Sequence, residues 1–144
     1  MKVNFLDLDR QYKELKPEID KAIFEVVESG RFILGDKVRE FEDHICDYLG
    51  IEEGLAVGCA SGSDALLLAL MDLDLEKGSE VITTPFTFFA TAGAIARLDL
   101  KPVFVDIDED FNISIPAIER AITKKTKAII TVDLYGNPVD MPRV

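Results

Sequence analysis

The first fifty residues carry apolar positions at the spacing of two amphipathic helices. In Arg10–Ser29, apolar side chains recur every three or four positions and define one helix face, made of Leu15, Ile19, Ile23, Val26 and Val27. Gly30 stands where helices commonly end in a left-handed residue. After a short extended link, a second helix is predicted from Gly35-Asp36 to about Leu49, and Gly50 ends it. Its apolar face comprises Val38, Phe41, Ile45, Cys46 and Leu49.

From about residue 55 the pattern changes to short apolar runs that alternate with helical ones. The runs predicted as strands are Leu55–Ala60, Glu80–Pro85, Pro102–Ile107 and Lys127–Leu134. The helices predicted between them are Asp64–Leu73, Phe88–Leu98 and Pro116–Thr123. Strands that are apolar throughout and alternate with helices favour a mostly parallel sheet covered on both faces.

The pattern therefore predicts an α/β fold, a partial three-layer α/β/α sandwich with a mostly parallel sheet. Residues 1–50 are expected to form a helical lead-in, and residues 51–144 the first part of a large α/β domain. The chain ends just where "NPVDMPRV" looks like the start of another helix. We therefore expect the sheet to be truncated.

Composition and charge narrow the classes of partner. A length of 144 residues is close to that of one domain, and 48% apolar and 30% charged residues are typical of a globular chain. The formal net charge of −11 disfavours nucleic acid and anionic membrane surfaces as partners. The longest purely apolar run, Ala65–Met71, is far shorter than the roughly 20 residues that span a bilayer. No signal-like segment opens the chain, and Cys46 and Cys59 match no metal or redox spacing, so a cytoplasmic protein with reduced thiols is expected.

A candidate binding site follows the first predicted strand. Ligands of open parallel sheets lie beyond the carboxyl ends of the strands, and Ser61-Gly62-Ser63 arrives there at the start of a helix. The free N–H groups of a helix N-terminus suit a phosphate, Gly62 allows close approach, and the two serines add hydroxyl donors. The alternative is that Ser63 or Asp64 caps the helix and that Gly62 serves only the turn. Chemistry alone leaves both interpretations open, since the Asp64 carboxylate disfavours an anion.

The stretch "TPFTFFAT" brings aromatic side chains to the same edge of the sheet. Phe86, Phe88 and Phe89 crowd the end of a strand and the start of a helix. One of them could cover a planar ring, although for any single one a place in the core is the simpler interpretation. A phosphate cradle and an aromatic platform at one edge together fit a phosphorylated heteroaromatic cofactor.

Several other chemistries lack their required residues. Around Ser61, the positions that a nucleophile elbow fills with glycine hold Cys59 and Ser63, and the single histidine, His44, lies far away in sequence. No P-loop lysine follows a glycine pair. The stretch "DIDEDFN" has Phe111 where a calcium loop needs glycine and Ala117 where it needs glutamate, so a solvated acidic turn is expected rather than a metal site.

Taken together, five blocks resemble the DegT/DnrJ/EryC1/StrS family of pyridoxal-phosphate-dependent sugar aminotransferases. They are "GRFILGDKVREFEDHICDYLG", "AVGCASGSDALLLAL", "GSEVITTPFTFFATAGAI", "KPVFVDIDEDFNI" and "TKAIITVDLYGNPVDM". The resemblance runs in order from about Phe5 to the last residue. It implies an aspartate-aminotransferase-like fold (fold type I) and a homodimer. It also implies transfer of an amino group, usually from glutamate, to a keto sugar linked to a nucleotide, in surface polysaccharide or amino-sugar biosynthesis.

The resemblance also implies roles for particular residues. Gly62 and Ser63 correspond to the family's Gly-Thr pair that holds the cofactor phosphate, next to Ser61. Phe88 corresponds to the aromatic residue that stacks on the pyridine ring, and Tyr135, in the "LYG" block, falls near the substrate. Pyridoxal 5'-phosphate is thus the expected cofactor of the full-length enzyme, with Ser61, Gly62, Ser63 and Phe88 as its ligands in this chain.

The departures from the family lie at the carboxy-terminal end. Family members are longer, and both the aspartate that pairs with the ring nitrogen and the lysine that bonds the cofactor come after the "LYGNPVDM" block. Lys101 and Lys127 precede strands, which places them at the opposite, amino edge of the sheet, and none of the other lysines is placed to replace the missing one. Asp133 closes a strand but precedes the family's aspartate, so it is not a substitute.

Three hypotheses follow. The chain is the amino-terminal part of a sugar aminotransferase and is inactive alone, or it is a short homologue without catalysis that serves as a binding or assembly subunit. The third, a regulator that acts on nucleic acid, fits the acidic charge poorly. In-frame sequence downstream of Val144 distinguishes the first two.

Overall fold

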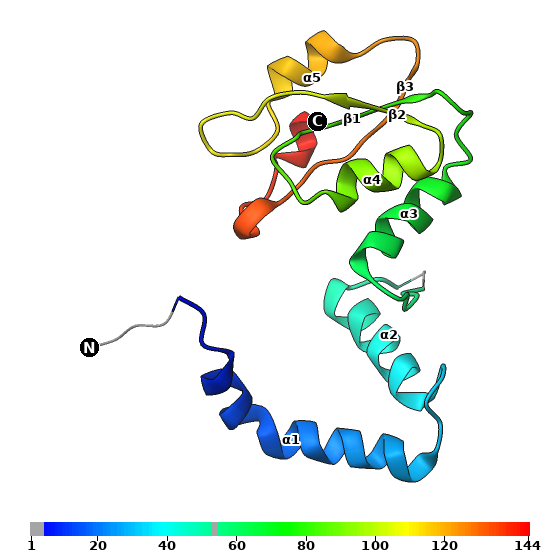
Figure 1. Ribbon diagram of the computed structural model, residues 1–144, viewed down its shortest axis with the longest axis vertical. Coiled ribbons are helices and arrows are strands. Elements are labelled where there is room, and N and C mark those ends of the chain that lie inside the picture. Colours follow the sequence, from blue (N-terminus) through cyan, green and yellow to red (C-terminus); the bar gives the residue numbers. More distant parts are fainter. Residues whose placement is uncertain (1–4, 53–54) are drawn as a thin grey trace. The chain divides into compact units, whose positions relative to one another are not determined.

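The computed structural model describes residues 5–52 and 55–144, which divide into two compact units (Figure 1). One unit comprises residues 1–58 and the other residues 59–144. We call them the N-terminal unit and the α/β unit. The domain boundary expected after residue 50 stays a prediction.

The N-terminal unit consists of helices α1 (Leu8–Ser29) and α2 (Asp36–Leu49). The Asp7 side chain caps α1 by accepting a hydrogen bond from the backbone N–H of Arg10, 3.3 Å away. Gly30 and Gly50 follow the two helices with φ of 64° and 65°. This left-handed conformation favours glycine, so the predicted ends of both helices are confirmed.

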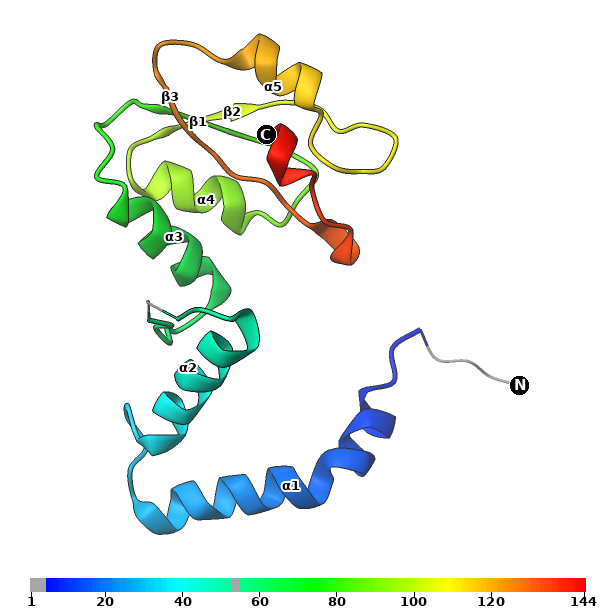
Figure 2. The same ribbon diagram turned by 180° about the vertical axis from the view of Figure 1, so that it is seen from behind.

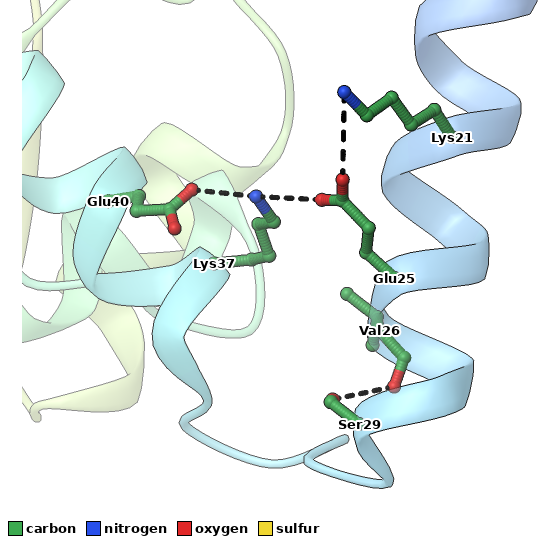
Figure 3. A network of polar contacts seen from close by, with 6 residues as sticks. All are labelled: Lys21, Glu25, Val26, Ser29, Lys37 and Glu40. Carbon is green, nitrogen blue, oxygen red and sulfur yellow. Dashed lines mark hydrogen bonds and ion pairs between the residues drawn. The ribbon is translucent and has the colours of Figure 1, made fainter.

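Polar contacts connect the two helices of this unit (Figure 3). The Lys37 Nζ of α2 lies 3.2 Å from Glu25 Oε2 of α1 and 2.9 Å from Glu40 Oε2 of its own helix. On α1, the Ser29 hydroxyl donates a hydrogen bond of 2.8 Å to the carbonyl of Val26. Neither helix contains a buried residue, so the predicted apolar faces are at most half-buried within the described residues.

The α/β unit is built on a parallel sheet of three strands in the order β2-β1-β3. The strands are β1 (Glu80–Thr83), β2 (Lys101–Phe104) and β3 (Thr126–Ile129). The helices are α3 (Gly62–Asp72), α4 (Ala90–Arg97) and α5 (Ile115–Ala121), and each leads into the next strand. Each helix therefore ends toward the amino edge of the sheet, where the strands start.

Two apolar clusters fill the space on either side of the sheet. Val81 of the central strand packs with Leu70 of α3 and Ile95 of α4. The next residue, Ile82, packs with Ile118 of α5 on the other face, since successive strand residues point to opposite faces. Figures 1 and 2 show α3 and α4 on one side of the strands and α5 on the other. The predicted three-layer arrangement is confirmed.

The predicted strand at Leu55–Ala60 is wrong. This segment forms no strand, and Leu55 and Val57 are 90% and 73% exposed. The backbone N–H of Gly58 donates instead to Glu42 Oε1 of α2, at 2.6 Å. A strand needs a neighbouring backbone to take its hydrogen bonds, and no strand of the described residues pairs with this segment.

The last strand is shorter than predicted, because β3 ends at Ile129 rather than at Leu134. The backbone N–H of Ile130 still donates to the carbonyl of Ile82 at 2.8 Å. Strand β1 ends at Thr83, so it provides no partner for a longer β3. The residues after Ile130 therefore leave the sheet. They form short 3-10 turns, η1 (Leu134–Gly136) and η2 (Met141–Arg143), and only η2 lies in the stretch "NPVDMPRV" that had suggested the start of a helix.

Candidate functional site at the carboxyl edge of the sheet

The topology brings the predicted site segments toward the carboxyl edge of the sheet. Phe88 lies between the end of β1 and the start of α4, and Tyr135 follows β3. Helix α3 ends at the amino edge, so its first residues, Gly62 and Ser63, point the other way. Helices α3 and α4 pack against each other through Leu70 and Ile95. The order of strands and helices thus places Phe88 and Tyr135 after the ends of strands, whereas the first turn of α3 reaches the last turn of α4 through Asp64 and Arg97.

Ser61 is the residue that caps α3. Its hydroxyl accepts a hydrogen bond from the backbone N–H of Asp64 at 3.2 Å, and its carbonyl accepts from Ala65 at 2.9 Å. The sequence had suggested Ser63 or Asp64 for this role, so that detail is corrected. The backbone N–H groups of Gly62 and Ser63 have no acceptor within the described residues. Two donors at a helix N-terminus thus remain free for an anion.

The glycine at position 62 is not explained by its backbone conformation. Its φ is outside the left-handed region, and a Cβ built on it meets no atom of residues 5–52 and 55–144 within 4 Å. The fold of this chain would therefore accept a larger residue here. The open space above Gly62 and the two free N–H groups fit the phosphate of a cofactor that approaches the start of α3.

The carboxylate of Asp64 is less adverse to an anion than the sequence suggests. One of its oxygens, Oδ1, lies 3.8 Å from Nη1 of Arg97, in the last turn of α4. The other, Oδ2, lies 3.2 Å from the Ser61 hydroxyl. Arg97 thus offsets a negative charge beside the free N–H groups. Sequence reasoning missed this residue, because only tertiary packing brings it to α3.

The three phenylalanines of residues 86–89 lie in different surroundings, and none is buried. The Phe86 ring stacks on Phe111, with centroids 6.0 Å apart and planes inclined by 30°. The Phe89 ring lies over Gly93, where an added Cβ would be 3.2 Å from a ring carbon. Phe88 is 75% exposed. Core packing, the simpler expectation for each ring, is therefore wrong, and Phe88 is open to a ligand.

Tyr135 stands in a strained and exposed turn. It is 90% exposed, and its φ of 58° is left-handed, which is uncommon for a residue with a side chain. The turn is held from outside, since Asn137 Nδ2 donates to the carbonyl of Asp110 at 2.9 Å. Asp133 Oδ1 accepts from the backbone N–H of Val139 at 3.0 Å. The carboxylate of Asp133 is thus engaged within the turn.

The acidic turn of "DIDEDFN" holds this segment in place. Ile107 and Ile113 form an antiparallel bridge that closes the turn. Asn112 is 7% exposed, and its Nδ2 lies 3.3 Å from Asp110 Oδ2 and 3.3 Å from the carbonyl of Pro138. These bonds join the turn to the residues that follow Tyr135. The amides of Asn112 and Asn137 were a signal for such a role, but a sequence does not show their partners.

The whole chain can be compared with known proteins. A profile of the DegT/DnrJ/EryC1/StrS aminotransferase family matches residues 13–144. The chain belongs to this family. Over its full length it is 53% identical to a protein of Geobacillus stearothermophilus named pleiotropic regulatory protein, of which it covers 38%. Over 99% of its length it is 45% identical to UDP-N-acetyl-3-dehydro-alpha-D-glucosamine 3-aminotransferase of Acidithiobacillus ferrooxidans, again covering 38%.

A solved structure agrees with this placement in the DegT/DnrJ/EryC1/StrS family. NtdA of Bacillus subtilis, determined with bound cofactor PMP, matches with a TM-score of 0.90 and 35% identity. The match covers 99% of this chain and 33% of NtdA. The chain thus has the partial fold of a pyridoxal-phosphate-dependent aminotransferase and spans about two fifths of the length of the curated relatives.

The lysines of this family member lie away from the candidate site. Within the described part of the α/β unit, Lys101 opens β2, Lys127 lies near the start of β3, and the remaining lysines, Lys77, Lys124 and Lys125, lie in the loops before β1 and β3. All are therefore at the amino edge.

In the same described ranges, no helix is long and apolar enough to cross a membrane.

Proposed function

We propose that the protein containing this chain is a pyridoxal-phosphate-dependent aminotransferase that acts on a keto sugar linked to a nucleotide. The observation that carries the proposal is the start of α3, where the backbone N–H groups of Gly62 and Ser63 have no acceptor among the described residues. Family membership and the aminotransferase named among the relatives support the reaction class. Glutamate as amino donor, a homodimer, a role in polysaccharide or amino-sugar biosynthesis and a cytoplasmic location belong to the same proposal.

Each candidate residue has a distinct task in this proposal. The N–H groups of Gly62 and Ser63 and the Ser63 hydroxyl donate hydrogen bonds to the cofactor phosphate. Ser61 holds the first turn of α3 in place, and Arg97 offsets the charge of Asp64. Phe88 covers one face of the cofactor ring and excludes water, while Tyr135 contacts the sugar nucleotide. The cofactor, when bound, supplies the electron sink through which an amino group is moved.

The relative with the name of a regulator does not change this conclusion. The formal net charge of −11 is unfavourable for direct binding to the phosphates of nucleic acid. A site for a phosphorylated cofactor needs only a few donors at one point, and the start of α3 offers them within an acidic chain. The N-terminus of α3 thus supports an enzyme rather than a nucleic-acid-binding protein.

Gly62→Ala tests the proposal most directly. Because a Cβ at this position meets nothing within 4 Å, the variant should fold as well as the original chain. Its methyl group would, however, occupy the space proposed for the phosphate. We expect an affinity for pyridoxal phosphate about tenfold weaker or worse, at an unchanged thermal midpoint. The measurement is a titration of cofactor absorbance with the complete polypeptide that contains residues 1–144.

Phe88→Leu and Phe89→Leu form a matched pair for the aromatic platform. The first should weaken cofactor binding, whereas the second removes a ring that lies over Gly93 and should not. Mass spectrometry with isotope-labelled glutamate and a UDP-linked 3-keto sugar then tests amino transfer itself. Cofactor binding that is insensitive to Gly62→Ala and Phe88→Leu would contradict the proposed site. Binding of the cofactor without amino transfer would favour a binding or assembly subunit.

A further inference from the structure

The amino edge of the sheet, opposite the candidate cofactor site, carries a hollow of about 320 Å³. Four lysines line it, Lys77, Lys124, Lys125 and Lys127, together with Ser79. We call it the lysine hollow. Its lining residues come from the loop that leads from α3 into β1 and from the residues that lead from α5 into β3. These loops converge because β1 and β3 are parallel neighbours, with Glu80 opposite Thr126.

The concentration of positive charge in this hollow is unusual for so acidic a chain. The sequence has 16 lysine and arginine residues against 27 acidic ones, yet four of the 16 surround one hollow. Lys77 pairs with Asp99 at 2.7 Å. Among the described residues, Lys124, Lys125 and Lys127 form no ion pair. An anion placed among these three ammonium groups would be attracted to each of them.

Helix dipoles do not account for this cluster. A helix C-terminus attracts cations only within its last turn. Helix α5 ends at Ala121, and Lys124, Lys125 and Lys127 all lie beyond that turn. A negative residue, Glu76, also lines the hollow and would limit its affinity for an anion. The dipole of α5 therefore does not account for the position of these lysines.

The backbone that carries two of the lysines is held by several hydrogen bonds. The Thr123 hydroxyl accepts from the N–H of Lys125 at 3.0 Å, and the Thr126 hydroxyl accepts from the N–H of Thr123 at 2.9 Å. The carbonyl of Lys125 accepts from the N–H of Glu80 at 2.8 Å. The turn is thus fixed to the sheet before any ligand arrives, which lowers the entropic cost of binding.

Ser79 supplies a neutral donor to the hollow. Its residue is 8% exposed, its N–H donates to Glu76 at 3.0 Å and its carbonyl accepts from Lys101 at 2.9 Å. Its hydroxyl forms no hydrogen bond with any residue of ranges 5–52 and 55–144, and no fully buried side-chain oxygen there lacks a partner. The hydroxyl therefore remains open to the hollow.

We propose that the lysine hollow binds a small anion with two adjacent phosphate groups, either free diphosphate or the diphosphate of a nucleotide. Several ammonium groups act as separate point charges and suit an anion whose charge is spread over many oxygens. Among the described residues no arginine lines the hollow, so the planar fork that best recognises a single carboxylate is missing there. A volume of about 320 Å³ lies at the lower end of the range for small-molecule sites. The proposal does not depend on the aminotransferase reaction.

Titration calorimetry with the full chain tests the proposal, with sodium pyrophosphate, orthophosphate and uridine diphosphate as probes. We expect pyrophosphate to bind at least about tenfold more tightly than orthophosphate. Equal binding of the two would overturn the claim of adjacent phosphates. Uridine diphosphate that binds more tightly than pyrophosphate would assign the site to nucleotides, and one that binds no better would assign it to free diphosphate.

Two triple variants of equal charge provide the control. Replacing Lys124, Lys125 and Lys127 by Gln should raise the pyrophosphate dissociation constant about tenfold or more. Replacing Lys13, Lys16 and Lys21 of α1 by Gln should change it less than about twofold. If both triple variants lost pyrophosphate affinity equally, the effect would be one of net charge, and the proposed site would be contradicted. Ser79→Ala should weaken pyrophosphate binding severalfold. Duplex DNA that competes with pyrophosphate at equal concentration would indicate a nucleic-acid surface and contradict the proposal.

Discussion

The two units of this chain place their apolar residues in contrasting environments. Helices α1 and α2 carry clear apolar stripes but contain no buried residue, and Ile23 and Phe41 are 56% and 61% exposed. Every buried apolar residue of the described chain lies in the α/β unit, above all Val81, Ile82 and Ile95. The difference teaches that an amphipathic stripe specifies a helix, whereas burial requires a surface that covers it. The sheet has two faces, and helices cover both.

The strongest test of this contrast is to shorten one isoleucine to alanine in each unit. Ile95→Ala leaves a cavity between α4 and the sheet and should lower the free energy of unfolding by about 2–5 kcal/mol. Ile23→Ala, on the half-exposed face of α1, should cost less than about 1 kcal/mol. Urea unfolding followed by circular dichroism measures both. Equal losses would mean that α1 is as well packed as the sheet.

A smaller effect concerns the buried carboxylate that joins the starts of the three strands. Glu80 is 7% exposed, its Oε2 accepts from the Thr123 hydroxyl at 2.6 Å and its Oε1 from Lys101 Nζ at 3.0 Å. The hydrogen bond from Thr123, and then the one from Lys101, lower the pKa of Glu80, although burial opposes them. Folding therefore favours the charged form of this side chain.

The direction of the pH dependence follows from this lowered pKa. The stabilisation is complete above the unfolded pKa of about 4.3 and is lost as the pH falls through the folded pKa. Glu80→Gln should thus lower the free energy of unfolding near neutral pH. The difference in this free energy between the original chain and the variant should disappear in acid. Urea unfolding midpoints, measured from neutral to acidic pH, give this difference. Glu109→Gln, in the exposed acidic turn, is the control. A stability difference between Glu80→Gln and the original chain that grows in acid would contradict the lowered pKa of Glu80.

The smallest effect is expected in the N-terminal unit. Lys37 pairs with Glu25 and Glu40, but its side chain is 46% exposed, and exposed ion pairs contribute little to stability. Lys37→Gln should leave the thermal midpoint within experimental error, and about 1 M salt should have as little effect. A clear loss would show that the network of Figure 3 holds α1 and α2 together.

Much of the fold follows from local patterns in the sequence. The apolar spacing predicted α1 and α2 with their terminal glycines, and the alternation of strands and helices predicted the parallel three-layer unit. The wrong strand at Leu55–Ala60 has a simple cause. A run such as "LAVGCA" is apolar enough for a strand, but a strand exists only beside another strand, and the described residues provide none.

The candidate sites divide in the same way. The sequence by itself pointed to Ser61, Gly62 and Ser63 through their chemistry at the start of a helix, and the family resemblance added the expected roles of Phe88 and Tyr135. Only the tertiary structure decided that Ser61 is the cap, that Phe88 is exposed and that Arg97 reaches Asp64. It also gathered the lysines of two separate loops at one edge. Contacts between residues far apart in the chain depend on how the layers pack, and no local pattern encodes them.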